Sequence, residues 1–256
     1  MSSEEKDYIE GIYNYCDRWC EKCGFTAHCY LFTQESKIKT YEIMHNGSLS
    51  GIEEMFKKDI RGISNDRTGD EDTGEDTVDD EFLESLDEKD EDEENVTGLG
   101  EQYEPEHPLN ELLDVYFNKA SIFAELLNKN YDMSSVSQDK VRERIGENTF
   151  DDFEVFIWFY TFIGAKLKRA LFGLNELRKE DDDDLKEIHK YDMNGSAKIG
   201  IIAVKRSIQA LNNLHKNLND FFAETEELLI LLGKILNTAE ELFPDCMDFK
   251  RPGFDG

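Results

Sequence analysis

Residues 149–174, TFDDFEVFIWFYTFIGAKLKRALFGL, form the most strongly apolar helical pattern in this chain. Large apolar residues recur there at intervals of three and four, the period of an α-helix, at Phe153, Phe156, Ile157, Tyr160, Ile163, Leu167, Leu171 and Leu174. Apolar residues also cover much of the other faces, and a helix of that kind is buried on several sides. The stretch therefore predicts a central helix, with Thr149 and Asp152 in capping-box spacing near its start.

Three further stretches have one broad apolar face each, at residues 108–129, 195–218 and 220–243. The last two are separated near Asn219 and Asp220 by polar residues but by no proline or glycine, and an acidic run at 180–184 ends the central helix. Alternating patterns typical of strands are scarce. We predict an all-α fold, a helical bundle of about four long helices with an N-terminal four-cysteine metal-binding module.

Charge divides the chain into three predicted regions. Residues 66–94 hold 17 acidic and two basic residues, which accounts for 15 of the 29 net negative charges. Self-repulsion and few bulky apolar residues favour disorder in such a run. We predict a cysteine module at 1–65, an acidic disordered insertion at 66–104 and the helical bundle at 105–256. Apolar residues at helical spacing predict two short helices in the cysteine module, at residues 2–14 and 52–60.

Composition also limits the location and the partners that we expect. The sequence has no apolar run of 18 residues, and its first residues have neither a basic start nor an apolar stretch, so we expect no membrane span, no secretory signal and a cytoplasmic protein. A net charge of -29 repels phosphate backbones, so we expect no nucleic-acid partner. A protein partner is compatible with the acidic insertion.

Four of the five cysteines lie in one stretch, CDRWCEKCGFTAHC, at residues 16–29. In a reducing compartment such a cluster indicates metal binding or catalysis rather than disulfides. Gly24 relaxes the backbone after the two central cysteines, and the flanking cysteines lie one helical turn before and one small loop after. Four thiolates suit a closed zinc site and a 4Fe-4S cluster equally well. The predicted ligands are Cys16, Cys20, Cys23 and Cys29.

The last ten residues of this stretch, CEKCGFTAHC, resemble the iron–sulfur loop of CRISPR adaptation nucleases and bacterial helicase–nuclease subunits, with Phe25 as the aromatic residue after the middle cysteine. That family usually has proline where Gly24 stands, its remaining cysteine lies far upstream, and its nuclease core has no counterpart here. The resemblance implies a set of cluster ligands, and we slightly favour 4Fe-4S over zinc.

The spacing of Cys16, Cys20 and Cys23 also matches the radical SAM motif. That family leaves one iron open for its cofactor, whereas Cys29 could close the site here, and the surrounding barrel is missing. We reject this interpretation, and redox-active thiols remain a further alternative. Cys246 stands alone and is predicted to be a buried or idle thiol.

Charged residues on apolar helix faces suggest one more feature. Arg206 shares its face with Ile202, Ala203 and Ala210, and a buried guanidinium requires a partner. We predict a buried ion pair of Arg206 with Glu154 or Glu224, in a structural rather than a ligand-binding role.

Two functions from different classes follow. The first is a metal- or cluster-binding accessory or interaction protein without enzymatic activity. The alternative is an iron–sulfur redox enzyme with a small-molecule site in the bundle near Glu154 and Arg206. No glycine-rich phosphate loop, nucleophile elbow or zinc-protease motif occurs, so the sequence leaves open whether the protein is an enzyme.

Overall fold

The computed structural model describes residues 7–48, 107–131 and 138–255. The chain divides into two compact units, Met1–Tyr30 together with Glu104–Gly256, and Leu31–Tyr103. The first unit differs from the predicted regions, because residues 1–30 group with the helical bundle and not with residues 31–65. The predicted acidic insertion at 66–104 lies outside the described residues.

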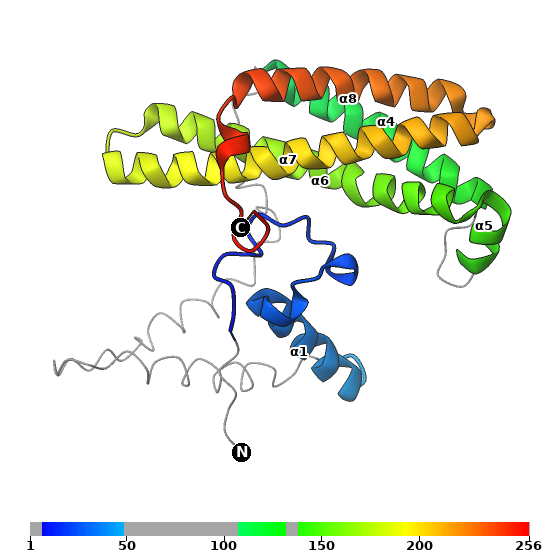
Figure 1. Cartoon of the computed structure of the whole chain (residues 1–256), viewed down its shortest axis with the longest axis horizontal. Helices are drawn as coiled ribbons and strands as arrows, with labels where there is room; N and C mark the ends of the chain where they lie inside the picture. Colours follow the sequence, from blue (N-terminus) through cyan, green and yellow to red (C-terminus); the bar gives the residue numbers. More distant parts are fainter. Residues whose placement is uncertain (1–6, 49–106, 132–137, 256) are drawn as a thin grey trace, which may run out of the picture. The chain divides into compact units, whose positions relative to one another are not determined.

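The first unit contains a bundle of four long helices: α4 (Pro108–Tyr131), α6 (Glu147–Lys179), α7 (Asp183–Asn217) and α8 (Phe222–Leu242). Each helix contacts two neighbours, in the order α4, α6, α7, α8 and back to α4, so the ring is closed. Successive long helices run antiparallel (Figure 1), as in up-and-down bundles, and short connections join α6 to α7 and α7 to α8. A shorter helix, α5 (Gln138–Ile145), precedes α6. The predicted all-α helical bundle is confirmed.

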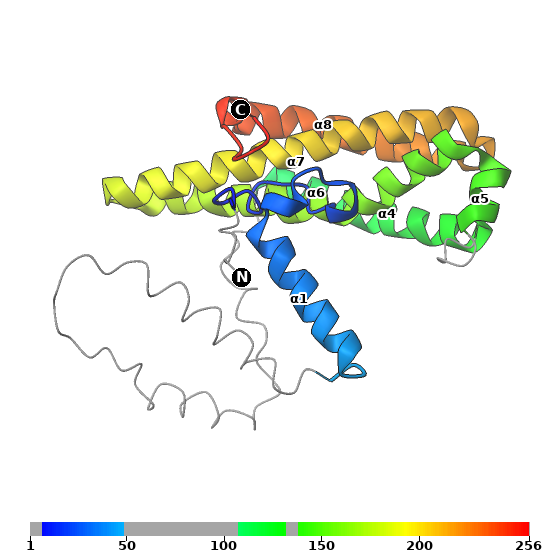
Figure 2. The same ribbon diagram turned by 60° about the horizontal axis from the view of Figure 1, so that its bottom comes forward.

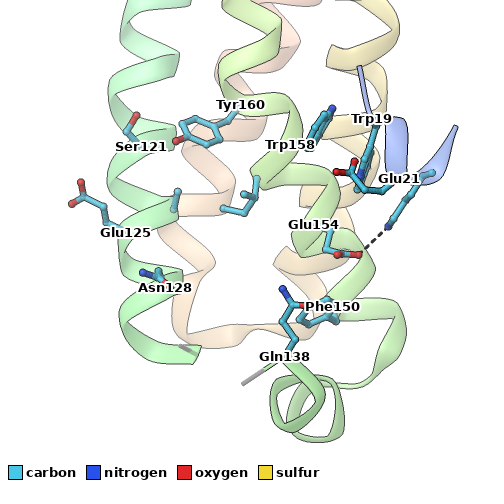
Figure 3. A pocket seen from close by; sticks show the side chains of 13 residues that line it. Trp19, Glu21, Ser121, Glu125, Asn128, Gln138, Phe150, Glu154, Trp158 and Tyr160 are labelled. Atoms are coloured by element: carbon cyan, nitrogen blue, oxygen red, sulfur yellow. Dashed lines mark hydrogen bonds and ion pairs between the residues drawn. The ribbon is translucent and has the colours of Figure 1, made fainter. Parts of the chain in front are cut away.

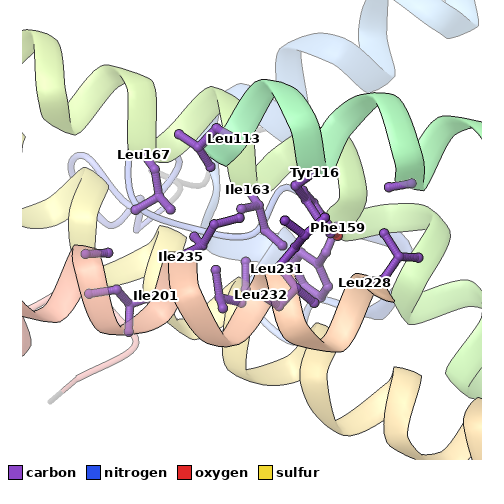
Figure 4. Close-up of a cluster of buried hydrophobic side chains, with 14 of the residues drawn as sticks. Leu113, Tyr116, Phe159, Ile163, Leu167, Ile201, Leu228, Leu231, Leu232 and Ile235 are labelled. Carbon is purple, nitrogen blue, oxygen red and sulfur yellow. The ribbon is translucent and has the colours of Figure 1, made fainter. Parts of the chain in front are cut away.

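The core consists of large side chains that interdigitate between these helices (Figure 4). Phe123 of α4 packs 5.1 Å, centroid to centroid, from Phe156 of α6 and 5.8 Å from Phe221 at the start of α8. Helix α6 buries Phe153, Phe159 and other residues on more than one side, which confirms its central place. Full burial of one such side chain contributes roughly 1.5–3 kcal/mol.

The first residues of α6 and α7 differ from those that the sequence pattern predicted. Helix α6 begins at Glu147, after Gly146 at φ 85°, and Thr149 and Asp152 instead accept hydrogen bonds from asparagines of α7. Helix α7 begins at Asp183, well before residue 195, because the Asp182 carboxylate accepts from two amides of its first turn. Residues 183–194 are mostly polar, so no apolar stripe indicated this extension.

The described part of the second unit contains helix α1, Tyr30–Met44. No residue of α1 is buried, and the sequence analysis did not predict it because its apolar residues form no stripe. The short helix predicted at residues 52–60 lies outside the described residues.

The predicted helix at residues 2–14 is wrong for its described part. Residues 7–9 have no regular structure and residues 10–14 form turns, with Gly11 at φ 69°. The Ile9 amide donates to the His28 carbonyl at 3.0 Å. A helix over this segment would break both features, and glycine makes the positive φ accessible.

Within the described part of the chain, the structure has no helix of the length and apolar character needed to cross a bilayer.

Candidate functional site

The cysteine segment, residues 16–29, contains two short 3₁₀ turns. The first, η1, is Cys20–Lys22, and the second, η2, is Thr26–His28. The Cys23 amide donates to the Cys20 carbonyl at 3.2 Å, and the Cys29 amide closes the second turn in the same way at 3.3 Å. Three of the cysteines therefore lie at the ends of turns, and all four are free thiols.

The sulfur atoms of Cys16 and Cys23 accept hydrogen bonds from the backbone. The Arg18 amide donates to Cys16 Sγ and the Phe25 amide to Cys23 Sγ, each at 3.4 Å. An amide that points at sulfur favours the thiolate, the form that binds metals. Burial nevertheless raises the pKa of Cys16, against the smaller opposing effects of the Arg18 amide and the Lys166 ammonium.

The structure does not gather the four cysteines into a metal site. Among the residues that it describes, which include all four, no three histidine, cysteine, aspartate or glutamate side chains are grouped so that they could hold a metal ion. Cys29 is buried, whereas Cys16, Cys20 and Cys23 are partly exposed. The four thiols are suitable ligands for zinc or for an iron–sulfur cluster. Their side chains must move closer to one another before they can bind the same ion.

Trp19, between the first two cysteines, anchors the segment on the bundle. Its ring is 7% exposed, stacks on Trp158 of α6 at a centroid distance of 5.3 Å, and meets Phe159 edge-on. Figure 2 shows this part of the chain running across α6. The Trp19 side chain therefore belongs to the hydrophobic core of the bundle.

Asp17, which no motif in the sequence indicates, is the polar anchor of the segment. Its carboxylate accepts from the Trp19 amide at 3.1 Å and from Arg206 Nη1 at 2.8 Å, and its carbonyl accepts from Trp158 Nε1 at 2.9 Å. One residue thus links the cysteine segment to both α6 and α7. Only its position between two cysteines singles Asp17 out in the sequence.

These contacts correct the predicted ion pair. Arg206 pairs with Asp17 and not with Glu154 or Glu224, and its side chain is 41% exposed, so the pair lies at the edge of the core. The guanidinium lies 4.7 Å from the centroid of the Phe159 ring. The predicted partners were wrong because only tertiary packing brings residue 17 beside residue 206.

Glu154 has other partners. Its Oε2 lies 2.9 Å from Lys22 Nζ of the cysteine segment and 3.7 Å from Arg142 Nη2 of α5. Glu224 lies partly buried in the first turn of α8, and no ion pair of it occurs within the described residues.

A pocket of about 750 Å³ lies where the cysteine segment meets α4, α5 and α6 (Figure 3). Trp19, Glu21 and Lys22 form one side of it, and Glu154 and Trp158 of α6 form another. Of the two residues predicted to lie near a small-molecule site, Glu154 lines this pocket, whereas Arg206 does not.

The C-terminal tail, residues 246–255, contacts the N-terminal segment, residues 7–30, at two places. Phe254 meets Phe25 at a centroid distance of 4.9 Å, and Phe249 meets Tyr15 at 4.8 Å. Lys198 of α7 is 7% exposed and pairs with Asp255 at 2.7 Å. Lys198 is therefore a buried structural residue whose charge is balanced by the Asp255 carboxylate.

The fifth cysteine, Cys246, lies outside this segment. It is 1% exposed, in a short turn after α8, and burial raises its pKa to about 11. The predicted buried thiol is confirmed.

Comparisons of the chain with protein-family models, with curated proteins and with solved structures found no match. Its function must therefore be argued from the cysteine segment and the pocket.

Proposed function

We propose that this chain is a metal- or iron–sulfur-cluster-binding helical protein that acts as an accessory or interaction protein. Cys16, Cys20, Cys23 and Cys29 would hold the ion or cluster. The observation that carries the proposal is that four free thiols lie within one turn-rich stretch and that backbone amides point at two of the sulfurs. Hydrogen bonds from amides to sulfur also accompany thiolate ligands in known cluster sites.

Binding would close the cysteine segment around the metal. Coordination deprotonates thiols and couples metal binding to local folding. The segment has few buried apolar residues of its own, so a metal would supply the cohesion that its core lacks. A zinc ion would act there as a structural staple, whereas a 4Fe-4S cluster would add one-electron chemistry.

The location of the segment supports a role beyond a local staple. Trp19, Glu21 and Lys22 lie between the proposed ligands and also line the pocket. Closure of the cysteine segment around a metal would therefore move residues that line one side of that pocket. This arrangement suits a protein whose interactions respond to metal occupancy, in the cytoplasm and with a protein partner rather than a nucleic acid.

Because the pocket lies close to the cysteines, we also propose a second candidate function. It is that of an iron–sulfur redox enzyme with its small-molecule site at Glu154. This candidate requires a redox-active cluster, which zinc cannot replace. It predicts that a pocket ligand shifts the reduction potential of the cluster. A protein that contains zinc alone would exclude it.

The test is the iron and zinc content per chain after purification without oxygen and without a metal-affinity step. We expect about four iron atoms or about one zinc ion per chain. Cys23→Ser should lose most of that metal. Cys246→Ala, which changes the one cysteine outside the segment, should keep it. A wild-type chain without either metal, or a full metal content in Cys23→Ser, would contradict the proposal.

A further inference from the structure

The pocket beside the cysteine segment has an unequal balance of charge. Glu21, Glu125 and Glu154 place three carboxylates around it, whereas Lys22 is the one cation among its lining residues. Since carboxylates attract cations and repel anions, this lining favours a positively charged ligand. Its volume of about 750 Å³ lies within the range of small-molecule sites.

Aromatic faces reinforce that preference. Trp19 and Trp158 stack with an interplanar angle of 11°, and both line the pocket. The faces of tryptophan rings carry negative electrostatic potential and attract ammonium and guanidinium groups. The pocket therefore combines the two features that recognise organic cations, carboxylates and an electron-rich ring.

The chain already places a cation between these features. Lys22 Nζ lies 4.2 Å from the centroid of the Trp19 ring and 2.9 Å from Glu154 Oε2. The side chains of Lys22 and Glu154 are 46% and 26% exposed, and ion pairs at such positions are weak because water screens the charges. A cation from outside can replace the Lys22 ammonium at little cost.

Apolar surface lies next to this position. Phe150, Ile157 and Ala124 line the pocket together with the two tryptophans. A ligand with an apolar body would cover that surface while its nitrogen meets Glu154. Simple inorganic cations lack such a body.

We propose that this pocket binds an organic cation with an apolar body, whose ammonium or guanidinium group takes the place of Lys22 Nζ between Glu154 and the Trp19 ring. The ligand is a free amine or the lysine or arginine side chain of a partner protein, which share this chemistry. No cysteine lines the pocket, so the proposal does not depend on the metal site.

The experiment is a titration of the full chain with 2-phenylethylamine, followed through the indole N–H signals of the two tryptophans by NMR. The chain has only Trp19 and Trp158, so both signals report on the pocket. The neutral isostere 2-phenylethanol serves as the control ligand. We expect the amine to shift both signals in a saturable manner and the alcohol to bind at least about tenfold more weakly.

Three variants test the position of the charge. Glu154→Gln should weaken amine binding about tenfold or more, because it removes the carboxylate that the nitrogen meets. Lys22→Met should strengthen it several-fold, because the competing ammonium is gone, and a merely structural lysine would not give a gain. Glu143→Gln removes an exposed carboxylate outside the pocket and should leave binding unchanged.

A second arm uses blocked dipeptides, acetyl-Phe-Lys-amide and acetyl-Phe-Arg-amide. Tighter binding of the dipeptides than of the amine would point to a protein side chain as the ligand, and the reverse order to a free amine. Equal binding of alcohol and amine, no effect of Glu154→Gln, weaker binding in Lys22→Met, or no saturable shift with any probe would overturn the proposal.

Discussion

The helical bundle and the N-terminal segment, residues 7–30, belong to the same compact unit but are stabilised in different ways. The bundle is held by side chains such as Phe123, Phe153 and Phe159, which are 0–1% exposed and pack on one another. The N-terminal segment has only four buried hydrophobic residues and is attached through Trp19, Asp17 and the C-terminal tail. The segment therefore derives its order from the bundle, and it should open at a lower free energy than the bundle unfolds.

The largest expected effect comes from the bundle core. Phe123→Ala should lower the free energy of unfolding by about 3–5 kcal/mol, because it leaves a cavity between α4, α6 and the start of α8. Denaturant unfolding followed by circular dichroism measures it. When the bundle of this variant unfolds, the N-terminal segment should become disordered with it, since the segment cannot remain ordered without the bundle.

Tyr116→Phe is a control within the same core. The Tyr116 hydroxyl is fully buried beside Ser207, and burial raises its pKa. Tyr116→Phe keeps the ring and removes only the hydroxyl with its contact to Ser207, so the loss should be about 1 kcal/mol or less. If Tyr116→Phe lowered the free energy of unfolding as much as Phe123→Ala does, this hydroxyl would have an important partner.

An effect of intermediate size is expected from changing Asp17, which anchors the cysteine segment. Asp17→Ala removes the ion pair with Arg206 and the hydrogen bond from the Trp19 amide. We expect the free energy of opening of the segment to fall by about 1–2 kcal/mol, with little change in the unfolding of the bundle. Amide hydrogen exchange of residues 7–30, compared with that of α8, measures the difference.

The double variant with Arg206→Ala separates the ion pair from the other contacts of Asp17. If the pair matters, the two substitutions together should cost less than the sum of their separate effects. Equal protection of residues 7–30 in wild type and Asp17→Ala would contradict the role of Asp17 as an anchor.

The smallest effect should be a pH-dependent release of the C-terminal tail. Hydrogen bonds from Arg251, and then from Lys198, hold the pKa of Asp255 well below its ordinary value of 3.8. A lowered pKa means that the carboxylate stabilises the folded tail above pH 3.8 and that this contribution is lost as the pH falls below it. The rate of amide hydrogen exchange of residues 246–255, corrected for its intrinsic pH dependence, should rise as the pH falls below 3.8.

Asp255→Asn should produce the same release at neutral pH, and Asp248→Asn serves as a control because Asp248 is an exposed residue of the same tail. If the tail in Asp255→Asn exchanged as slowly as in wild type, the ion pairs of Asp255 would not be what holds it.

Local pattern predicted the bundle well because each long helix must bury one face. The stripe from Leu109 to Leu127 and the aromatic run from Phe153 indicated their helices directly, and the polar boundary at Asn219 was confirmed as a 3₁₀ turn. Helix α1 was missed because it buries nothing within the described structure. The start of α7 was missed because a cap, and not an apolar stripe, determines it.

The candidate site was predicted only in part. Clustering along the chain identified the four cysteines, and the turn at Cys20–Cys23 is present. The partner of Arg206 and the second wall of the pocket were not predictable, because Asp17 and Trp19 lie far from α6 and α7 in sequence. Gly195 shows the same dependence, since a Cβ there would collide with the ring of Tyr15.

The sequence by itself determined the helical class of this protein, the buried faces of its long helices and the presence of four thiols in one short stretch. These features depend on periodicity and on residue type, which are local properties of the chain. The tertiary structure alone decided that this stretch docks on α6 through Trp19 and Asp17, that Arg206 pairs with Asp17, and that a pocket forms beside Glu154. The physical reason is that ion pairs and pockets form between residues distant in sequence, whose meeting depends on the packing of the whole bundle.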